Sequence, residues 1–208
     1  MTDAVFVSGW AGPETLFPGL SARLDFLAPF LDGDEAAVIA RVAASPARLL
    51  AGWSTGAHML LRHAATLFPR AGKVVLFAPF ARFGDSFPDR ITKSMRAAMD
   101  EAPEATVRAF WKNCGAPGES GASDVTGAPA WNPAWAAPLA AGLDYLRASA
   151  VAASPVPAAN VTVVWGTRDR IVRRAALDRA LALLPGATLA VTDGGHWPSP
   201  DLLAEHLI

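Results

Sequence analysis

Six short and almost uninterrupted apolar segments constrain the fold of this chain more than any other feature. They are Ala4–Ser8, Leu24–Leu31, Arg48–Trp53, Lys73–Phe80, Val161–Gly166 and Thr188–Thr192. Strands of a parallel sheet are buried on both faces, so they are apolar throughout instead of alternating with polar residues. The segments therefore predict a mostly parallel sheet of about six strands.

Helical patterns separate most of these segments. They cover Asp34–Ala44, Thr55–Phe68, Arg173–Leu184 and Ser199–Leu207. Strands that alternate with helices form a doubly wound α/β fold, in which each crossover is right-handed.

The alternation stops between residues 80 and 161. A connection of about eighty residues is far longer than a crossover loop. Segment 81–160 is therefore expected to form a helical cap, inserted into a core built from 1–80 and 161–208. Within it we expect helices over Arg90–Met99, Glu104–Asn113 and Pro138–Ala148, and a loop over Gly115–Gly127.

Composition excludes several classes of protein. Hydrophobic residues make up 52% of the 208 residues, which rules out a disordered chain, and a net charge of −1 argues against a nucleic-acid partner. Cys114 is the single cysteine, so no internal disulfide forms and a reducing compartment is expected. Mean hydropathy is +0.26, but prolines interrupt the long uncharged stretch Val125–Leu143. Because the first residues also lack a signal-peptide pattern, we expect a cytoplasmic protein, monomeric and without membrane contact.

The sharpest motif is Gly52-Trp53-Ser54-Thr55-Gly56, which fits G-x-S-x-G. It lies between an expected strand and an expected helix, the context in which a serine sits on a tight, strained turn above a sheet. Its alternative is a chance match in a chain rich in small residues. Placement between strand and helix favours Ser54 as a nucleophile.

A nucleophilic serine needs a base, and the chain has four histidines. His196 lies in Asp193-Gly194-Gly195-His196-Trp197-Pro198, a loop directly after the last expected strand, and is the predicted general base. His58 is expected to be structural because its helix runs away from Ser54. His63 and His206 are expected at the surface or the core edge.

An acid must orient that base. Asp169 follows the fifth expected strand, at the sheet edge where α/β sites assemble. Asp193 is the rival acid, and a helix-capping role is the alternative for Asp169. The order Ser54, Asp169, His196 is that of α/β hydrolases. The backbone N–H groups of Trp10 and Thr55 are the expected oxyanion donors.

These residues together resemble the α/β-hydrolase superfamily, over nearly the whole chain. Five segments narrow the likeness to the pimeloyl-[acyl-carrier protein] methyl ester esterases of biotin synthesis. They are Gly9–Gly12, Gly52–Gly56, Leu139–Leu146, Trp165–Asp169 and Gly195–Pro198. Two features depart from that pattern: Ser8-Gly9 replaces the usual His-Gly, and the usual two strands before this loop are absent. A strand order of 2-1-3-4-5-6 follows from the resemblance.

The resemblance implies a serine esterase without metal or cofactor. Its substrate would be a small ester borne on acyl-carrier protein, held by basic residues of the cap: Arg90, Lys93, Arg96, Arg108 and Lys112. Ordinary solvated charge is the alternative for these five. Aromatic side chains expected to wall an acyl channel are Trp10, Trp53, Phe80, Trp111 and Trp197, although each could simply be buried.

Two other functions remain open at this stage. One is a generic short-chain carboxylesterase or thioesterase with no need of a carrier. The other is a non-catalytic, hydrolase-like receptor for a small apolar ligand, against which the intact set Ser54, Asp169 and His196 argues.

Overall fold

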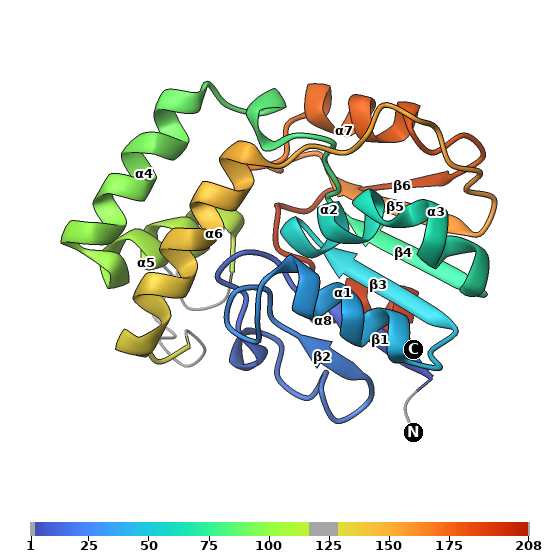
Figure 1. Ribbon diagram of the computed structural model, residues 1–208, viewed down its shortest axis with the longest axis horizontal. Helices are drawn as coiled ribbons and strands as arrows, with labels where there is room; N and C mark the ends of the chain where they lie inside the picture. Colours follow the sequence, from blue (N-terminus) through green and yellow to red (C-terminus); the bar gives the residue numbers. More distant parts are fainter. Residues whose placement is uncertain (1–2, 117–128, 208) are drawn as a thin grey trace.

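The computed structural model describes residues 3–116 and 129–207, and its centre is a six-stranded parallel sheet (Figure 1). The strands are β1 (Ala4–Val7), β2 (Asp25–Leu27), β3 (Leu49–Trp53), β4 (Lys73–Phe77), β5 (Val161–Gly166) and β6 (Thr188–Thr192). Their order across the sheet is β2-β1-β3-β4-β5-β6, and every neighbouring pair is parallel. The predicted fold class and strand order are therefore confirmed.

Burial explains why the apolar segments form strands here. β3, β4 and β5 lie inside the sheet and are buried along almost their whole length. The edge strand β6 is only partly buried. β2, the other edge, ends at Leu27 and is shorter than the segment Leu24–Leu31 that we predicted. An edge strand has a neighbour on one side only, so less of an apolar segment is held in the ladder.

Helices cover both faces of the sheet. They are α1 (Glu35–Ala44), α2 (Thr55–Arg62), α3 (Ala64–Leu67), α7 (Arg174–Ala182) and α8 (Pro200–Leu207). In Figure 1, α1, α2 and α3 lie in front of the sheet and α8 lies behind it. The predicted helix Thr55–Phe68 is broken at His63, which ends α2 and precedes α3.

Three further helices lie between β4 and β5, in the segment predicted as a cap: α4 (Asp89–Glu101), α5 (Pro103–Cys114) and α6 (Ala136–Ala148). They form a separate layer next to the carboxyl ends of the strands, on the left of Figure 1. Short 3-10 turns at Phe83–Asp85 and Pro133–Trp135 lead into this layer. Most of the predicted loop Gly115–Gly127 lies outside the described residues.

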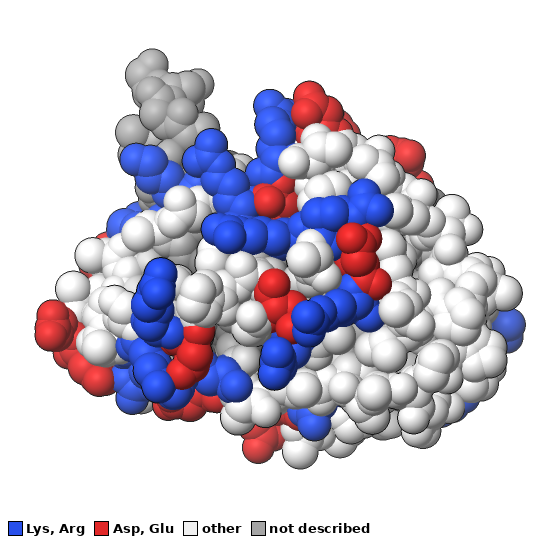
Figure 2. All heavy atoms as spheres, turned by 90° about the horizontal axis from the view of Figure 1, so that it is seen from above, with Lys and Arg blue, Asp and Glu red and all other residues white. Residues whose placement is uncertain are grey.

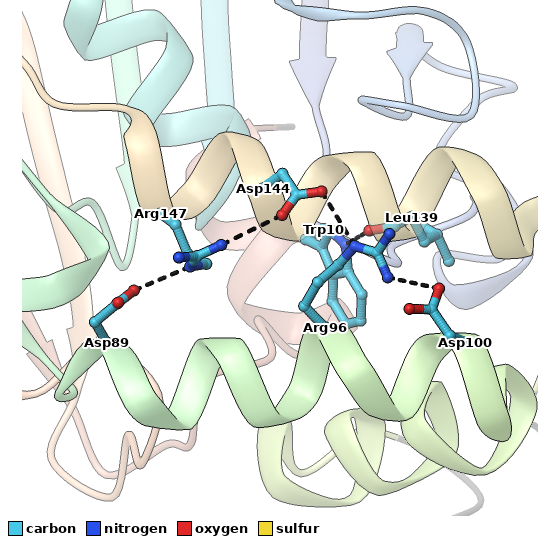
Figure 3. Close-up of polar contacts among 7 residues, drawn as sticks. All are labelled: Trp10, Asp89, Arg96, Asp100, Leu139, Asp144 and Arg147. Carbon is cyan, nitrogen blue, oxygen red and sulfur yellow. Dashed lines mark hydrogen bonds and ion pairs between the residues drawn. The ribbon is translucent and has the colours of Figure 1, made fainter.

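Ion pairs join α4 to α6. Figure 2 shows that, on the face seen from above, basic side chains lie beside acidic ones. Figure 3 resolves one such group: Arg147 contacts Asp89 at 3.0 Å and Asp144 at 3.5 Å, while Arg96 contacts Asp144 at 3.1 Å and Asp100 at 2.6 Å. Asp144 and Arg147 are three residues apart on α6, the spacing of neighbours on one helix face. Within the described ranges, no helix is both long and apolar enough to cross a bilayer.

Candidate active site

Ser54 stands at the turn from β3 into α2, and its backbone is strained. Its φ of 52° and ψ of −112° lie in a region that side-chain-bearing residues rarely adopt. Its N–H donates to the Phe77 carbonyl of β4 at 2.8 Å. Gly56 allows this turn, because a Cβ there would lie 2.1 Å from the Val7 carbonyl oxygen. The first turn of α2 thus packs directly on the end of β1.

His196 reaches the serine from the loop after β6. Its Nε2 lies 2.8 Å from the Ser54 hydroxyl oxygen, and its ring is buried. Two contacts fix the loop that carries it. The Trp53 indole N–H donates to the His196 carbonyl at 2.8 Å, and the Trp197 N–H donates to the Cys114 carbonyl, at the end of α5, at 3.0 Å.

Asp169 completes the group from the loop after β5. Its Oδ2 lies 2.8 Å from His196 Nδ1. Its other oxygen, Oδ1, accepts the backbone N–H groups of Ile171 at 2.7 Å and Val172 at 2.8 Å. These donors satisfy a carboxylate that is almost completely buried, which would otherwise be costly.

The rival acid lies elsewhere. Asp193 is largely exposed and pairs with Arg168, whose Nε lies 3.2 Å from Oδ1. Asp169 does not cap α7 either, since Arg173 precedes that helix. Of the two acids, the structure places Asp169 against the His196 ring.

The hydrogen-bond pattern assigns the protons. A carboxylate only accepts, so Nδ1 of His196 carries a proton and donates to Asp169. In the neutral ring Nε2 is then unprotonated, and it accepts the Ser54 hydroxyl proton. A serine, a base and an orienting acid in this order can carry out nucleophilic acyl transfer.

The two residues predicted to supply oxyanion N–H groups lie at the same cavity as the serine. They are Trp10, after β1, and Thr55, at the start of α2, and both line the cavity. Among the described residues, neither N–H has a hydrogen-bond acceptor. They stay the predicted donors to a developing oxyanion, a role that two unpaired N–H groups can fill in acyl transfer.

The cap holds the loop that carries Trp10. The Trp10 indole N–H donates to the Leu139 carbonyl of α6 at 2.8 Å (Figure 3), and the Trp111 indole N–H of α5 donates to the Ala11 carbonyl at 2.6 Å. Ala11 has a positive φ of 53°, so its peptide orientation depends on such contacts. α6 approaches Trp10 so closely that a Cβ at Gly142 would lie 2.7 Å from the indole.

The cavity has a volume of about 460 Å³ and a mostly apolar wall. Most of its lining comes from the cap helices and from the segment that precedes α4: Phe83, Phe87, Ile91, Thr92, Met95, Ala98, Thr106, Ala109, Phe110, Asn113, Leu143 and Leu146. The core contributes Trp10, Ser54, Thr55, Arg170 and Ile171. A drug-sized or acyl-chain-sized ligand fits such a volume.

Of the five aromatic residues predicted to line it, only Trp10 does so. Trp53, Phe80 and Trp111 are completely buried, where their size serves core packing. Trp197 lines two other hollows, one of which His196 also lines. The prediction of an aromatic channel made of all five is therefore corrected.

The residues that do line the cavity follow a pattern visible in the sequence. On α4, Ile91, Met95 and Ala98 are spaced at i, i+4 and i+7. Thr106, Ala109, Phe110 and Asn113 of α5 have the spacing of one helix face as well. Amphipathic periodicity in the cap, instead of aromatic content, would have identified the wall.

The other histidines have no contact with Ser54 through their rings. His58 is completely buried: its Nδ1–H donates to the Phe80 carbonyl at 2.9 Å and its Nε2 accepts from the Ser149 hydroxyl at 2.6 Å. Burial lowers the pKa of His58 to about 4, although the Phe80 carbonyl opposes this. The structure thus gives His58 a structural place between α2 and the end of α6. His63 pairs with Glu35 at 3.2 Å.

None of the five predicted carrier-binding residues lines the cavity. Lys93 contacts Asp89 at 2.9 Å, and Arg108 contacts Glu104 at 2.8 Å. Arg96 contacts two carboxylates, as Figure 3 shows. Arg90 and Lys112 are exposed on α4 and α5. Their predicted role has no support from the cavity geometry.

Comparison with known proteins agrees with this architecture. Residues 4–206 match the family model described as "Alpha/beta hydrolase family". Among solved structures, a hydrolase from Pseudomonas aeruginosa PA01 has a TM-score of 0.68 at 16% identity. The match covers 94% of this chain and 83% of the hydrolase chain. An esterase from Rhodococcus sp. ECU1013 has a TM-score of 0.54 at 21% identity, with coverages of 97% and 85%.

A third similar structure is an enol-lactonase from Burkholderia xenovorans LB400, with a TM-score of 0.63 at 14% identity and coverages of 94% and 85%. No curated protein matches the chain. At identities this low, structural similarity shows a shared fold and does not show a shared substrate.

Proposed function

Because the chain belongs to the alpha/beta hydrolase family, we propose that it is a serine carboxylic-ester hydrolase that works through an acyl-enzyme. The observation that carries this proposal is the connected set Ser54, His196 and Asp169, with 2.8 Å at both of its contacts. Ser54 of this set lines an apolar cavity, which suits the acyl part of an ester.

Each step follows from the atoms already described. Nε2 of His196 takes the hydroxyl proton as the Ser54 oxygen attacks the ester carbonyl carbon. The carbonyl oxygen becomes an oxyanion, held by the N–H groups of Trp10 and Thr55. Protonated His196 is stabilised by Asp169 and gives its proton to the departing alcohol. A water molecule then repeats the sequence on the acyl-enzyme and releases the acid.

The finer proposal is the methyl ester of pimeloyl-[acyl-carrier protein]. The motifs of the elbow, the loop after β1 and the histidine loop support it, as does a cavity able to take a run of methylene groups. A generic carboxylesterase or thioesterase is the second candidate. It is favoured by the ion pairs in which Lys93, Arg96 and Arg108 already take part.

One experiment separates the two candidates. Purified protein is given pimeloyl-carrier methyl ester and, separately, a small nitrophenyl ester, beside its Ser54→Ala variant. Efficient cleavage of the carrier substrate that requires Ser54 supports the carrier proposal. Cleavage of the small ester alone leaves a generic esterase. Equal cleavage by wild type and Ser54→Ala would overturn the serine mechanism. Tight binding of an ester that is later released uncleaved would favour a receptor.

A further inference from the structure

Arg170 is the one charged residue among the described residues that line the cavity. It directly follows Asp169 in the chain, and it is exposed while Asp169 is buried. Every other lining side chain is apolar or carries an uncharged hydroxyl or amide group. A single cation on an apolar wall distinguishes one part of this cavity from the rest.

A second cation packs against another residue of the cavity wall. The guanidinium carbon of Arg173 lies 4.6 Å from the centroid of the Phe87 ring, and Phe87 lines the cavity. Within the described parts of the chain, neither Arg170 nor Arg173 contacts a carboxylate.

The acidic side chains of the neighbouring elements are already paired. Asp85 contacts Arg179 at 2.7 Å and Arg82 at 3.3 Å, and its side chain is almost fully buried by these contacts. Asp89 contacts Lys93 and Arg147. The face in Figure 2 shows the same mixture of basic and acidic side chains. Arg170 and Arg173 therefore leave positive charge at the cavity that these carboxylates do not neutralise.

From this arrangement we infer that Arg170, assisted by Arg173, forms a subsite for an anionic group of the substrate. A guanidinium holds a carboxylate or a phosphate through paired, charge-assisted hydrogen bonds. The substrate class is then an ester with an apolar chain that also carries one such anion. This inference rests on the proposed function, because it concerns the same cavity.

The subsite differs from the one predicted on the cap. Arg96 and Arg108 contact carboxylates of their own helices, and their side chains lie outside the cavity lining. Arg170 meets the requirement that they do not, because it lines the cavity that Ser54 also lines.

The test uses matched pairs of nitrophenyl esters. One member of each pair has an acyl chain that ends in a methyl group, and the other has a chain of equal length that ends in a carboxylate. Chains of about four to eight carbons sample the size of the cavity. The readout is the ratio of kcat/KM for the charged ester to kcat/KM for its neutral partner. A ratio cancels any general loss of activity that a substitution beside Asp169 causes.

We expect wild type to favour the charged member at one or more chain lengths, and Arg170→Gln to lower the ratio by about tenfold there. Arg173→Gln should lower it by a smaller factor, and Arg170→Lys should keep part of the preference. Arg174→Gln is the matched control, since Arg174 is exposed, pairs with Asp178 at 2.7 Å and does not line the cavity. Added salt should reduce the ratio in wild type.

A second arm distinguishes the two anions. Acyl chains that end in a phosphate monoester replace those that end in a carboxylate, and the larger dependence on Arg170 identifies the preferred group. A ratio that changes by less than about twofold in Arg170→Gln, for both anions and all chain lengths, would overturn the subsite. Failure of the proposed function looks different: the neutral esters would then be cleaved no faster by wild type than by Ser54→Ala.

Discussion

The corner formed by Ser54, His196 and Asp169, which we propose to be catalytic, and the cap formed by α4, α5 and α6 both use contacts to carboxylates, but in opposite environments. His196 and Asp169 have completely buried side chains, and the carboxylate gains two backbone N–H donors. Arg147 and Asp89, which join α6 to α4, remain 30% and 54% exposed. Buried charges need complete hydrogen bonding, whereas exposed pairs are screened by water and contribute little. Function should thus depend steeply on the corner and weakly on the ion pairs of the cap.

The largest effect should come from Asp169→Asn. The amide oxygen can keep the N–H groups of Ile171 and Val172, so that its NH₂ faces His196. Nδ1 must then accept, which places the ring proton on Nε2 and prevents it from taking the Ser54 proton. We expect kcat to fall by about 10⁴-fold while the fold is retained. Circular dichroism and ester kinetics check this, and near-normal kcat would exclude Asp169 as the orienting acid.

His58, a buried histidine outside the corner, should make the free energy of unfolding depend on pH in the acidic range. The pKa of His58 is lowered to about 4, so between pH 6.5 and about 4 the unfolded chain binds a proton that the folded chain does not. Stability therefore rises with pH in this window, and acidification to its lower end should cost about 3 kcal/mol.

Denaturant unfolding at several pH values measures this loss. His58→Gln should be less stable at neutral pH, because the contacts with Phe80 and Ser149 are disturbed, but its stability should fall less steeply below pH 6.5. Equal slopes in both proteins would show that His58 is not the responsible group.

Trp111→Phe tests whether the cap supports the corner through hydrogen bonds instead of ion pairs. The change keeps an aromatic ring and removes the N–H that holds the Ala11 carbonyl. A less well fixed loop should weaken oxyanion stabilisation, so we expect kcat to fall by about tenfold with little change in KM. Trp131→Phe is the control, because Trp131 packs against Trp135 and, among the described residues, its indole N–H does not donate to this loop. A change in KM alone would contradict a positioning role.

The smallest effect should come from Arg96→Gln, which removes contacts with Asp100 and Asp144 (Figure 3). These pairs lie at the surface, so we expect a small decrease in Tm that disappears at high salt, and unchanged kcat/KM for a small ester. A large loss of activity would show that the ion pairs of the cap, and not only its apolar face and indole contacts, shape the site.

Most of the core could be predicted from local patterns. Continuous apolar segments identified the six strands, and parallel strands bring their carboxyl ends to one edge. Residues after β3, β5 and β6 were therefore expected to meet, and the structure places Ser54, Asp169 and His196 within hydrogen-bonding distance. Their catalytic roles stay predictions.

Which aromatic side chains line the cavity could not be predicted in the same way. Trp53 and Trp111 are as aromatic as Trp10, and no local pattern shows which ring faces a cavity and which is buried in the core. The partners of Arg96 and Arg147 on another helix depend on how α4 packs against α6, which residue spacing within one helix cannot give. The break at His63 was missed because the apolar pattern continues through it.

The most direct test of the central claim is covalent labelling of Ser54. Wild type and Ser54→Ala are incubated with a fluorophosphonate, which reacts with an activated serine, and intact masses are measured before peptide mapping. The mechanism predicts a single adduct on Ser54 in wild type, none in Ser54→Ala, and slow labelling in Asp169→Asn. Equal labelling of wild type and Ser54→Ala, or an adduct on another residue, would contradict the claim that Ser54 is the activated nucleophile.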